Sequence, residues 1–149
     1  MTFLFDGEGH SDVTILLAHG AGAPMDSDFM EQIAAELDAR ECRVARFEFD
    51  YMAQRRQGAA RRPPPKIEKL MDEYRNAVAA LGQVDTLVIG GKSMGGRVAS
   101  MIADDMQAEG RIAGLLCLGY PFHPPSAPER LRTGHLARNR PVTTAGLFP

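Results

Sequence analysis

The chain has 149 residues, of which 44% are hydrophobic and 24% are charged, and its formal net charge is −2. This length fits one domain that buries roughly two thirds of the surface of the unfolded chain, and the small negative charge excludes a general basic field that would gather nucleic acid. No segment is as long as a membrane span, and the apolar run at the N terminus is too short for a signal peptide.

The first half of the chain predicts two strands and one helix. A continuous apolar run over 13–18 is typical of a strand that is covered on both faces, and a glycine-rich loop over 19–24 follows it. Ser27 or Asp28 can cap the next helix, in which apolar side chains keep helical spacing as far as Leu37. Residues 43–49 alternate in polarity and predict a second strand.

A polar segment then separates the two halves. Residues 50–65 end in three consecutive prolines, which favours a loop over a regular element. Its basic side chains are Arg55, Arg56, Arg61 and Arg62. They form either a rim that attracts carboxylate or phosphate groups or a solvated surface loop balanced by nearby acids, and we favour the second interpretation.

The second half predicts a helix, a strand, a helix and a strand. Residues 67–78 form an amphipathic pattern, and an apolar strand over 86–90 leads through a short turn into a helical pattern over 97–102. Residues 112–118 predict a fourth buried strand. Alternation of this kind predicts an α/β fold, a three-layer sandwich with a mostly parallel sheet, whose ligands bind beyond the carboxyl ends of the strands.

The turn after the third strand carries the most specific motif, Gly91-Lys92-Ser93-Met94-Gly95. Strand, Gly-x-Ser-x-Gly and helix is the context of a nucleophile elbow, in which Gly91 and Gly95 allow a close approach of backbone and Ser93 stands at the apex. A phosphate-binding loop is disfavoured because the position five residues before Gly91 is Thr86, where that motif needs glycine. A βα junction without function is the remaining alternative.

Four motifs in this order resemble the α/β-hydrolase superfamily. They are His19-Gly20-Ala21-Gly22-Ala23-Pro24, the arginine and triple-proline loop, Gly91-Lys92-Ser93-Met94-Gly95-Gly96 and Gly119-Tyr120-Pro121-Phe122. They are most similar to the dienelactone-hydrolase-like branch that includes the testis-expressed-protein-thirty and NSL-complex-subunit-three group. The resemblance covers roughly residues 12 to 135.

The resemblance implies a small-molecule acyl substrate and a role for several residues. Ser93 is the expected nucleophile, and the N–H groups of Met94 and Ala21 are the expected oxyanion hole. His19 follows the first strand, whereas the base of this fold comes late in the chain, so we expect His19 to anchor its loop by hydrogen bonds to backbone.

The sequence departs from the family pattern after Ser93. The family places an acid and then a histidine after later strands. The acids after Ser93 are Asp104, Asp105, Glu109 and Glu129, the first three on or at the end of the helix after the elbow, and the histidines are His123 and His135. We therefore expect a partial fold that lacks the last strand–helix units, with a hydrolase-like domain over 1–136 and an irregular tail over 137–149. The hypothesis is a truncated or frame-shifted member whose triad is incomplete and whose activity is weak.

Three further expectations follow. His123, oriented by Glu129, is a candidate substitute base, although a histidine fixed in a proline-rich loop is the favoured interpretation. The last strand loses its outer neighbour, so a tail strand over 142–144 or a second copy of the chain can cover the edge, which predicts a possible homo-oligomer. A non-catalytic binding or scaffold module is the alternative function.

The chain has two cysteines. Cys42 and Cys117 lie in or beside apparent strands without the spacing of a metal site. We expect reduced thiols in a cytoplasmic protein, no metal, no cofactor and no membrane partner.

Overall fold

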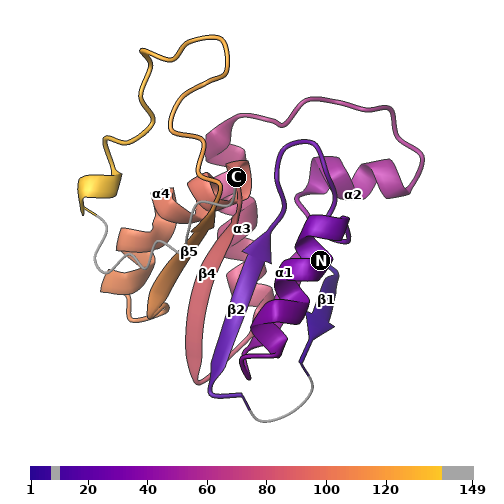
Figure 1. Ribbon diagram of the computed structural model, residues 1–149, viewed down its shortest axis with the longest axis vertical. Helices are drawn as coiled ribbons and strands as arrows, with labels where there is room; N and C mark the ends of the chain where they lie inside the picture. The colour runs from indigo at the N-terminus through magenta and orange to yellow at the C-terminus, as the bar shows by residue number, and fades with distance from the viewer. Residues whose placement is uncertain (8–10, 139–149) are drawn as a thin grey trace.

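The computed structural model describes residues 1–7 and 11–138, which form a five-stranded sheet with helices on both faces (Figure 1). The strands are β1 (Phe3–Asp6), β2 (Val13–Ala18), β3 (Arg43–Phe47), β4 (Thr86–Lys92) and β5 (Gly114–Leu118). Their order across the sheet is β1-β3-β2-β4-β5, with β1 antiparallel to β3 and every other pair parallel. The predicted α/β class with a mostly parallel sheet is confirmed.

Helices cover the two faces unequally. They are α1 (Asp28–Asp38), α2 (Asp50–Arg56), α3 (Ile67–Leu81) and α4 (Met94–Ala108), and a 3₁₀ turn, η1, covers Leu136–Arg138. Helices α3 and α4 pack on one face, where the larger core cluster contains Phe47, Ile89 and Ile102. On the other face α1 packs through Met30 and Ile33 on the smaller cluster. The three layers of the prediction are therefore present, and each strand alternates its side chains between the two clusters.

The structure differs from the sequence-based prediction at several element boundaries. Strand β1 was not predicted; it pairs Phe3 with Phe47 in antiparallel register, a contact that no local pattern announces. Strand β5 begins at Gly114 and not at residue 112, and β3 ends at Phe47 and not at residue 49. Of the predicted tail, residues 137 and 138 complete η1, and the proposed edge strand over 142–144 lies outside the described residues.

The prediction of a loop over 50–65 is wrong in its first half, because residues 50–56 form α2. Met52 is buried, and the N–H of Asp50 donates to Glu73 Oε2 at 2.9 Å, so contacts with α3 hold the first turn. These partners are distant in sequence, which explains why polar composition alone indicated a loop.

Tyr74 connects α3 to the strands that lead into the elbow. Its hydroxyl accepts the N–H of Gly90 at 2.9 Å and lies 2.8 Å from the carbonyl oxygen of Leu16 and 2.7 Å from that of Gly90. The side chain is fully buried, and burial raises the pKa of its phenol. The position of Gly90, three residues before Ser93, is therefore fixed from the helix side of the sheet.

The loops that follow the parallel strands gather at one end of the sheet. Figure 1 shows the loop after β2, the segment with α2 and the loop after β5 together at the upper end of the molecule, as the topology predicted. In the described part of the chain, no helix has the length and apolar content needed to cross a membrane.

Candidate functional site

Ser93 occupies a strained turn between β4 and α4. Its backbone has φ 49° and ψ −111°, a region that L-residues rarely adopt. Two hydrogen bonds hold the turn: the N–H of Ser93 donates to the carbonyl of Leu118 at 2.7 Å, and the N–H of Arg97 donates to the carbonyl of Ser93 at 3.0 Å. The hydroxyl makes no capping bond to the helix, and the residue is half-buried, so Oγ remains available to a ligand.

The glycines around Ser93 are required by close backbone contacts. A Cβ at Gly91 would collide with the carbonyl oxygen of Ala18 and lie 2.9 Å from the carbonyl carbon of Gly95. A Cβ at Gly95 would lie 2.6 Å from the carbonyl oxygens of both Ala18 and His19. This crowding is the geometric property that the elbow motif predicted.

The two predicted oxyanion-hole residues come shortly after β4 and β2, which are paired in parallel. Met94 is the first residue of α4, a position at which the N–H has no partner inside the helix. On the other side, β2 pairs Ala18 with Gly91, and a Cβ at Gly20 would lie 3.6 Å from the carbonyl oxygen of Lys92. Gly20, the residue before Ala21, therefore lies beside the end of β4, and the hydroxyl of Tyr51 donates to the carbonyl of Ala21 at 3.0 Å.

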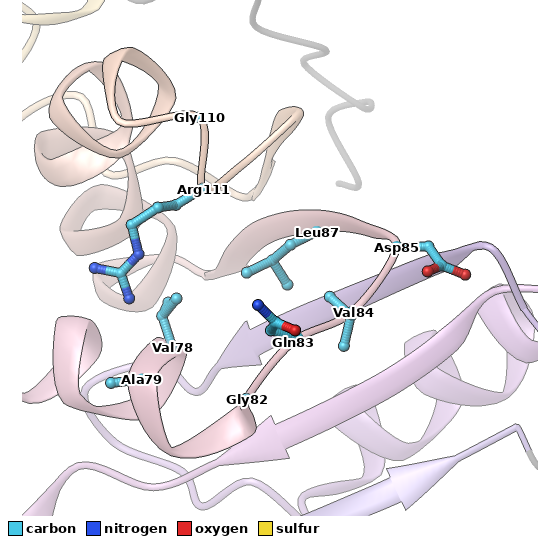
Figure 2. Close-up of a pocket in the computed structure, with 9 residues that line it drawn as sticks. All are labelled: Val78, Ala79, Gly82, Gln83, Val84, Asp85, Leu87, Gly110 and Arg111. Carbon is cyan, nitrogen blue, oxygen red and sulfur yellow. The ribbon is translucent and has the colours of Figure 1, made fainter.

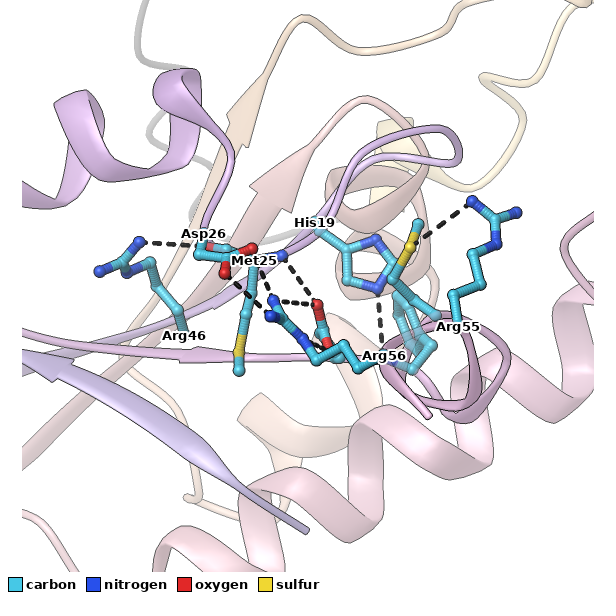
Figure 3. Close-up of polar contacts among 9 residues, drawn as sticks. His19, Met25, Asp26, Arg46, Arg55 and Arg56 are labelled. Atoms are coloured by element: carbon cyan, nitrogen blue, oxygen red, sulfur yellow. Dashed lines mark hydrogen bonds and ion pairs between the residues drawn. The ribbon is translucent and has the colours of Figure 1, made fainter. Parts of the chain in front are cut away.

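His19 anchors its loop in the way that the sequence suggested. Its Nδ1–H donates to the carbonyl of Gly20 at 2.6 Å, and its Nε2 accepts the N–H of Phe49 at 3.2 Å (Figure 3). The ring is fully buried, and this burial lowers its pKa, so His19 is neutral near pH 7. Both ring nitrogens are occupied by backbone groups, which leaves neither for proton transfer at Ser93.

The two arginines of α2 bond to other groups of the same chain. Arg56 bonds both Glu48, at 2.7 Å, and Asp26, and Glu48 accepts the N–H of Met25 at 3.2 Å (Figure 3). Hydrogen bonds from Arg56 lower the pKa of Asp26. Arg55 donates to the carbonyl of Arg62 at 2.6 Å. These contacts fasten α2 to the loop before α1 and favour the surface-loop interpretation over an anion-binding rim.

His123, the candidate substitute base, points to its own loop. It is exposed, and its Nδ1–H donates to the carbonyl of Pro124 at 2.9 Å. Within residues 1–7 and 11–138, no hydrogen bond joins it to Ser93 or to Glu129. The favoured interpretation of a loop histidine agrees with this geometry.

The structure reveals a different serine–histidine pair, which the sequence did not single out. Nε2 of His135 lies 2.8 Å from Oγ of Ser100 and 3.3 Å from the hydroxyl of Tyr120. Ser100 is buried in α4, seven residues and thus about 10 Å along the helix from Ser93. This pair joins the loop after β5 to α4, and Ser100 is too deeply buried to act as a nucleophile.

A pocket of about 670 Å³ lies at the opposite end of the sheet, between the ends of α3 and α4 (Figure 2). Val78, Gln83, Leu87 and Arg111 are among its lining residues. Leu87 and Ser93 are separated by most of the length of β4, roughly 20 Å, so this pocket does not serve the elbow. Among the described residues, no group of three His, Cys, Asp or Glu side chains could hold a metal ion.

Comparison with known proteins agrees with this geometry. The profile of a family described as alpha/beta hydrolase domain matches residues 11–145. Among curated proteins, none matches the chain.

Solved structures with this fold include three hydrolases. A serine hydrolase without a lid from Xanthomonas campestris has TM-score 0.61 at 20% identity, covering 80% of this chain and 56% of its own. A carboxylesterase structure from Nitrososphaera gargenis has TM-score 0.61 at 20% identity, and the match covers 93% of this chain and 49% of the carboxylesterase. A monoacylglycerol lipase from Paleococcus ferrophilus has TM-score 0.56 at 18% identity, covering 83% and 45%.

The chain spans about half the length of these solved structures. The family match extends over most of the sequence, from the residues before β2 to the residues after η1. The chain belongs to the alpha/beta hydrolase domain family.

Proposed function

We propose that the chain acts on ester, thioester or similar acyl substrates with Ser93 as the nucleophile. The observation that carries the proposal is the strained backbone of Ser93, which presents a hydroxyl without a capping bond between β4 and α4. Strain of this kind costs about 1–3 kcal/mol and persists where the surrounding structure enforces it, which is common at catalytic residues.

The proposed reaction begins when Oγ of Ser93 attacks the acyl carbon and passes its proton to a solvent water molecule. The N–H groups of Met94 and Ala21 bind the oxyanion, the alcohol or thiol departs with a proton, and water later cleaves the acyl–serine ester. Removing one donor of such a pair lowers the rate by about 10²–10³-fold. The neighbourhood of Gly20 and Lys92 supports this pairing of loops.

The described residues supply no general base to Ser93, since His19, His123 and His135 all bond to other groups. An oxyanion hole and substrate binding alone leave about 10³–10⁴-fold acceleration over water. We therefore propose slow turnover for this chain and rapid chemistry only with strongly activated substrates. The second candidate, a binding or scaffold module, is favoured by the same lack of a base within residues 1–7 and 11–138.

A fluorophosphonate probe distinguishes the two candidates. The hydrolase proposal expects labelling of the wild-type chain that disappears in Ser93→Ala and persists in Ser100→Ala, because Ser100 is buried. A scaffold module gives no labelling of the wild type beyond the level of Ser93→Ala.

We also propose that the outer edge of β5 pairs with a second copy of the chain. In the described part of the sheet, β5 bonds to β4 and has no strand on its other side, and an open edge is a template for pairing. Light scattering after size exclusion should give the mass of a dimer, and a monomer at high concentration would refute the pairing.

A further inference from the structure

A basic cluster lies where the loop after β5 meets the first turns of α4. Arg97 follows Ser93 by one helical turn, and side chains on a helix lean toward its N terminus, here toward Ser93. Arg132 is tied to this part of α4 by hydrogen bonds. Its carbonyl accepts the hydroxyl of Tyr120 at 2.8 Å, and Nε2 of His135 lies 3.3 Å from that hydroxyl and 2.8 Å from Oγ of Ser100 on α4.

Both guanidinium groups lack an anionic partner in the part of the chain that the structure describes. Neither Arg97 nor Arg132 forms an ion pair there. Nε of Arg97 is buried without a hydrogen-bond partner among those residues. Burial and then the charge of Arg132 lower the pKa of Arg97, while Tyr120 and then the opposite charge of Glu68 act to raise it. A buried donor without an acceptor is costly, and so is a like charge near it, unless an acceptor of opposite charge satisfies both.

His135 can add a third positive charge to this cluster. The hydroxyl of Ser100 donates to the carbonyl of Arg97 at 2.7 Å, and that of Tyr120 donates to Arg132, so both hydroxyls accept from Nε2–H of His135. Its Nδ1 therefore takes up the proton when the ring becomes charged.

The charges around His135 come from two elements. Burial, Arg97 and Arg138 lower its pKa, and Asp104 on α4 opposes them. An anion bound between the arginines would make protonation of the ring more favourable.

We propose that Arg97 and Arg132 bind an oxyanion, a carboxylate or phosphate, carried by the acyl substrate of Ser93. This inference rests on the proposed hydrolase function and narrows its substrates to acyl compounds with a second, anionic group. Arginine is suited to the task because its planar fork donates two parallel hydrogen bonds to such groups. Protonation of His135 tightens the binding as the pH falls, with Asp104 and Glu68 as the opposing carboxylates.

Binding is tested first without catalysis, by titrating the full chain with inorganic phosphate and with succinate in a calorimeter at pH 6 and pH 8. We expect millimolar or tighter binding that is roughly tenfold weaker in Arg97→Gln and in Arg132→Gln. Arg111→Gln removes the same charge at the far end of the sheet and should bind like the wild type. No binding, or equal binding in all four proteins, would overturn the inference. Both phosphate and succinate take up protons between pH 8 and pH 6, so the contribution of the ring is measured as the ratio of wild-type to His135→Gln affinity at each pH. This ratio should be larger at pH 6 than at pH 8, and an equal ratio at the two pH values would contradict a role for the ring.

The second measurement compares 4-nitrophenyl butyrate with the mono-4-nitrophenyl ester of glutaric acid. The ratio of turnover, anionic ester over neutral ester, should fall about tenfold in Arg97→Gln and Arg132→Gln and stay constant in Arg111→Gln. If the chain binds phosphate but turns over neither ester, or if its turnover is the same in Ser93→Ala, the hydrolase function is refuted and the anion site stands. Turnover that depends on Ser93 but keeps its ratio in both arginine variants refutes the substrate inference and leaves the hydrolase function intact.

Discussion

Removal of one buried hydroxyl should destabilise the sheet beneath the elbow. Tyr74→Phe deletes the oxygen that accepts the N–H of Gly90 at 2.9 Å and that donates to one of two carbonyls, those of Leu16 and Gly90. The ring remains, so the packing of the core changes little, and the effect comes from the polar groups left behind.

The magnitude follows from this accounting. A buried donor that loses its acceptor costs about 1–3 kcal/mol, and Tyr74 is fully buried, so water does not replace the hydroxyl. We expect about 2 kcal/mol loss in the free energy of unfolding, which corresponds to a fall in Tm of roughly 4–8 °C for a chain of this size. The denaturant slope should stay constant because the surface exposed on unfolding is the same.

Urea unfolding followed by circular dichroism measures the change, and Tyr51→Phe is the matched control. Tyr51 also donates to a backbone carbonyl, that of Ala21, but this bond lies at the surface. Water can replace it, so the control should lose under about 0.5 kcal/mol. An equal loss in the two variants, or no loss in Tyr74→Phe, would show that the hydroxyl of Tyr74 does not hold Gly90 in place.

Four other predictions test the site. Ser93→Gly should raise the free energy of unfolding by about 1 kcal/mol, since glycine adopts positive φ freely, while fluorophosphonate labelling disappears; a loss of stability would contradict the strain. Gly95→Ala should cost about 1–3 kcal/mol, because its Cβ would meet two carbonyl oxygens at 2.6 Å, whereas Gly22→Ala, with nothing within 4 Å, should be neutral. Turnover of 4-nitrophenyl acetate should be unchanged in His123→Ala, and a fall in turnover would support His123 as the general base. The lowered pKa of His19 means that the unfolded chain gains a proton first as pH falls below about 6.5, so stability is present above that pH and is lost below it; pH-dependent urea unfolding of His19→Gln should show a smaller loss.

The elbow was predictable because its signal is local. A strand, a glycine-framed serine and a helix stand next to one another in the sequence, and the steric need for Gly91 and Gly95 follows from that turn alone. The hydrogen bonds of His19 to the carbonyl of Gly20 and the N–H of Phe49 likewise agree with a prediction made from its place after a strand. The narrower branch within the superfamily remains a prediction.

The features that sequence reasoning missed depend on partners far along the chain. Strand β1 is defined by its pairing with β3, and α2 by contacts of Asp50 and Arg56 with residues of other elements. Tyr74 looked like one more apolar residue of an amphipathic helix, although its hydroxyl is bonded 16 residues away. Hydrogen-bond partners at such separations leave no periodic pattern, so no window of residues predicts them.

The choice of serine at residue 93 is itself an argument about function. At φ 49° and ψ −111° a glycine at residue 93 would make the fold more stable. The hydroxyl of Ser93 does not offset this strain by capping a helix N–H. The supports of this turn come from separate elements: Leu118 at the end of β5 accepts its N–H, and the carbonyl of Ala18 at the end of β2 lies against Gly91 and Gly95. Backbone strain that holds a hydroxyl without a capping bond at the carboxyl ends of the strands is best explained if that hydroxyl reacts with, or binds, a ligand.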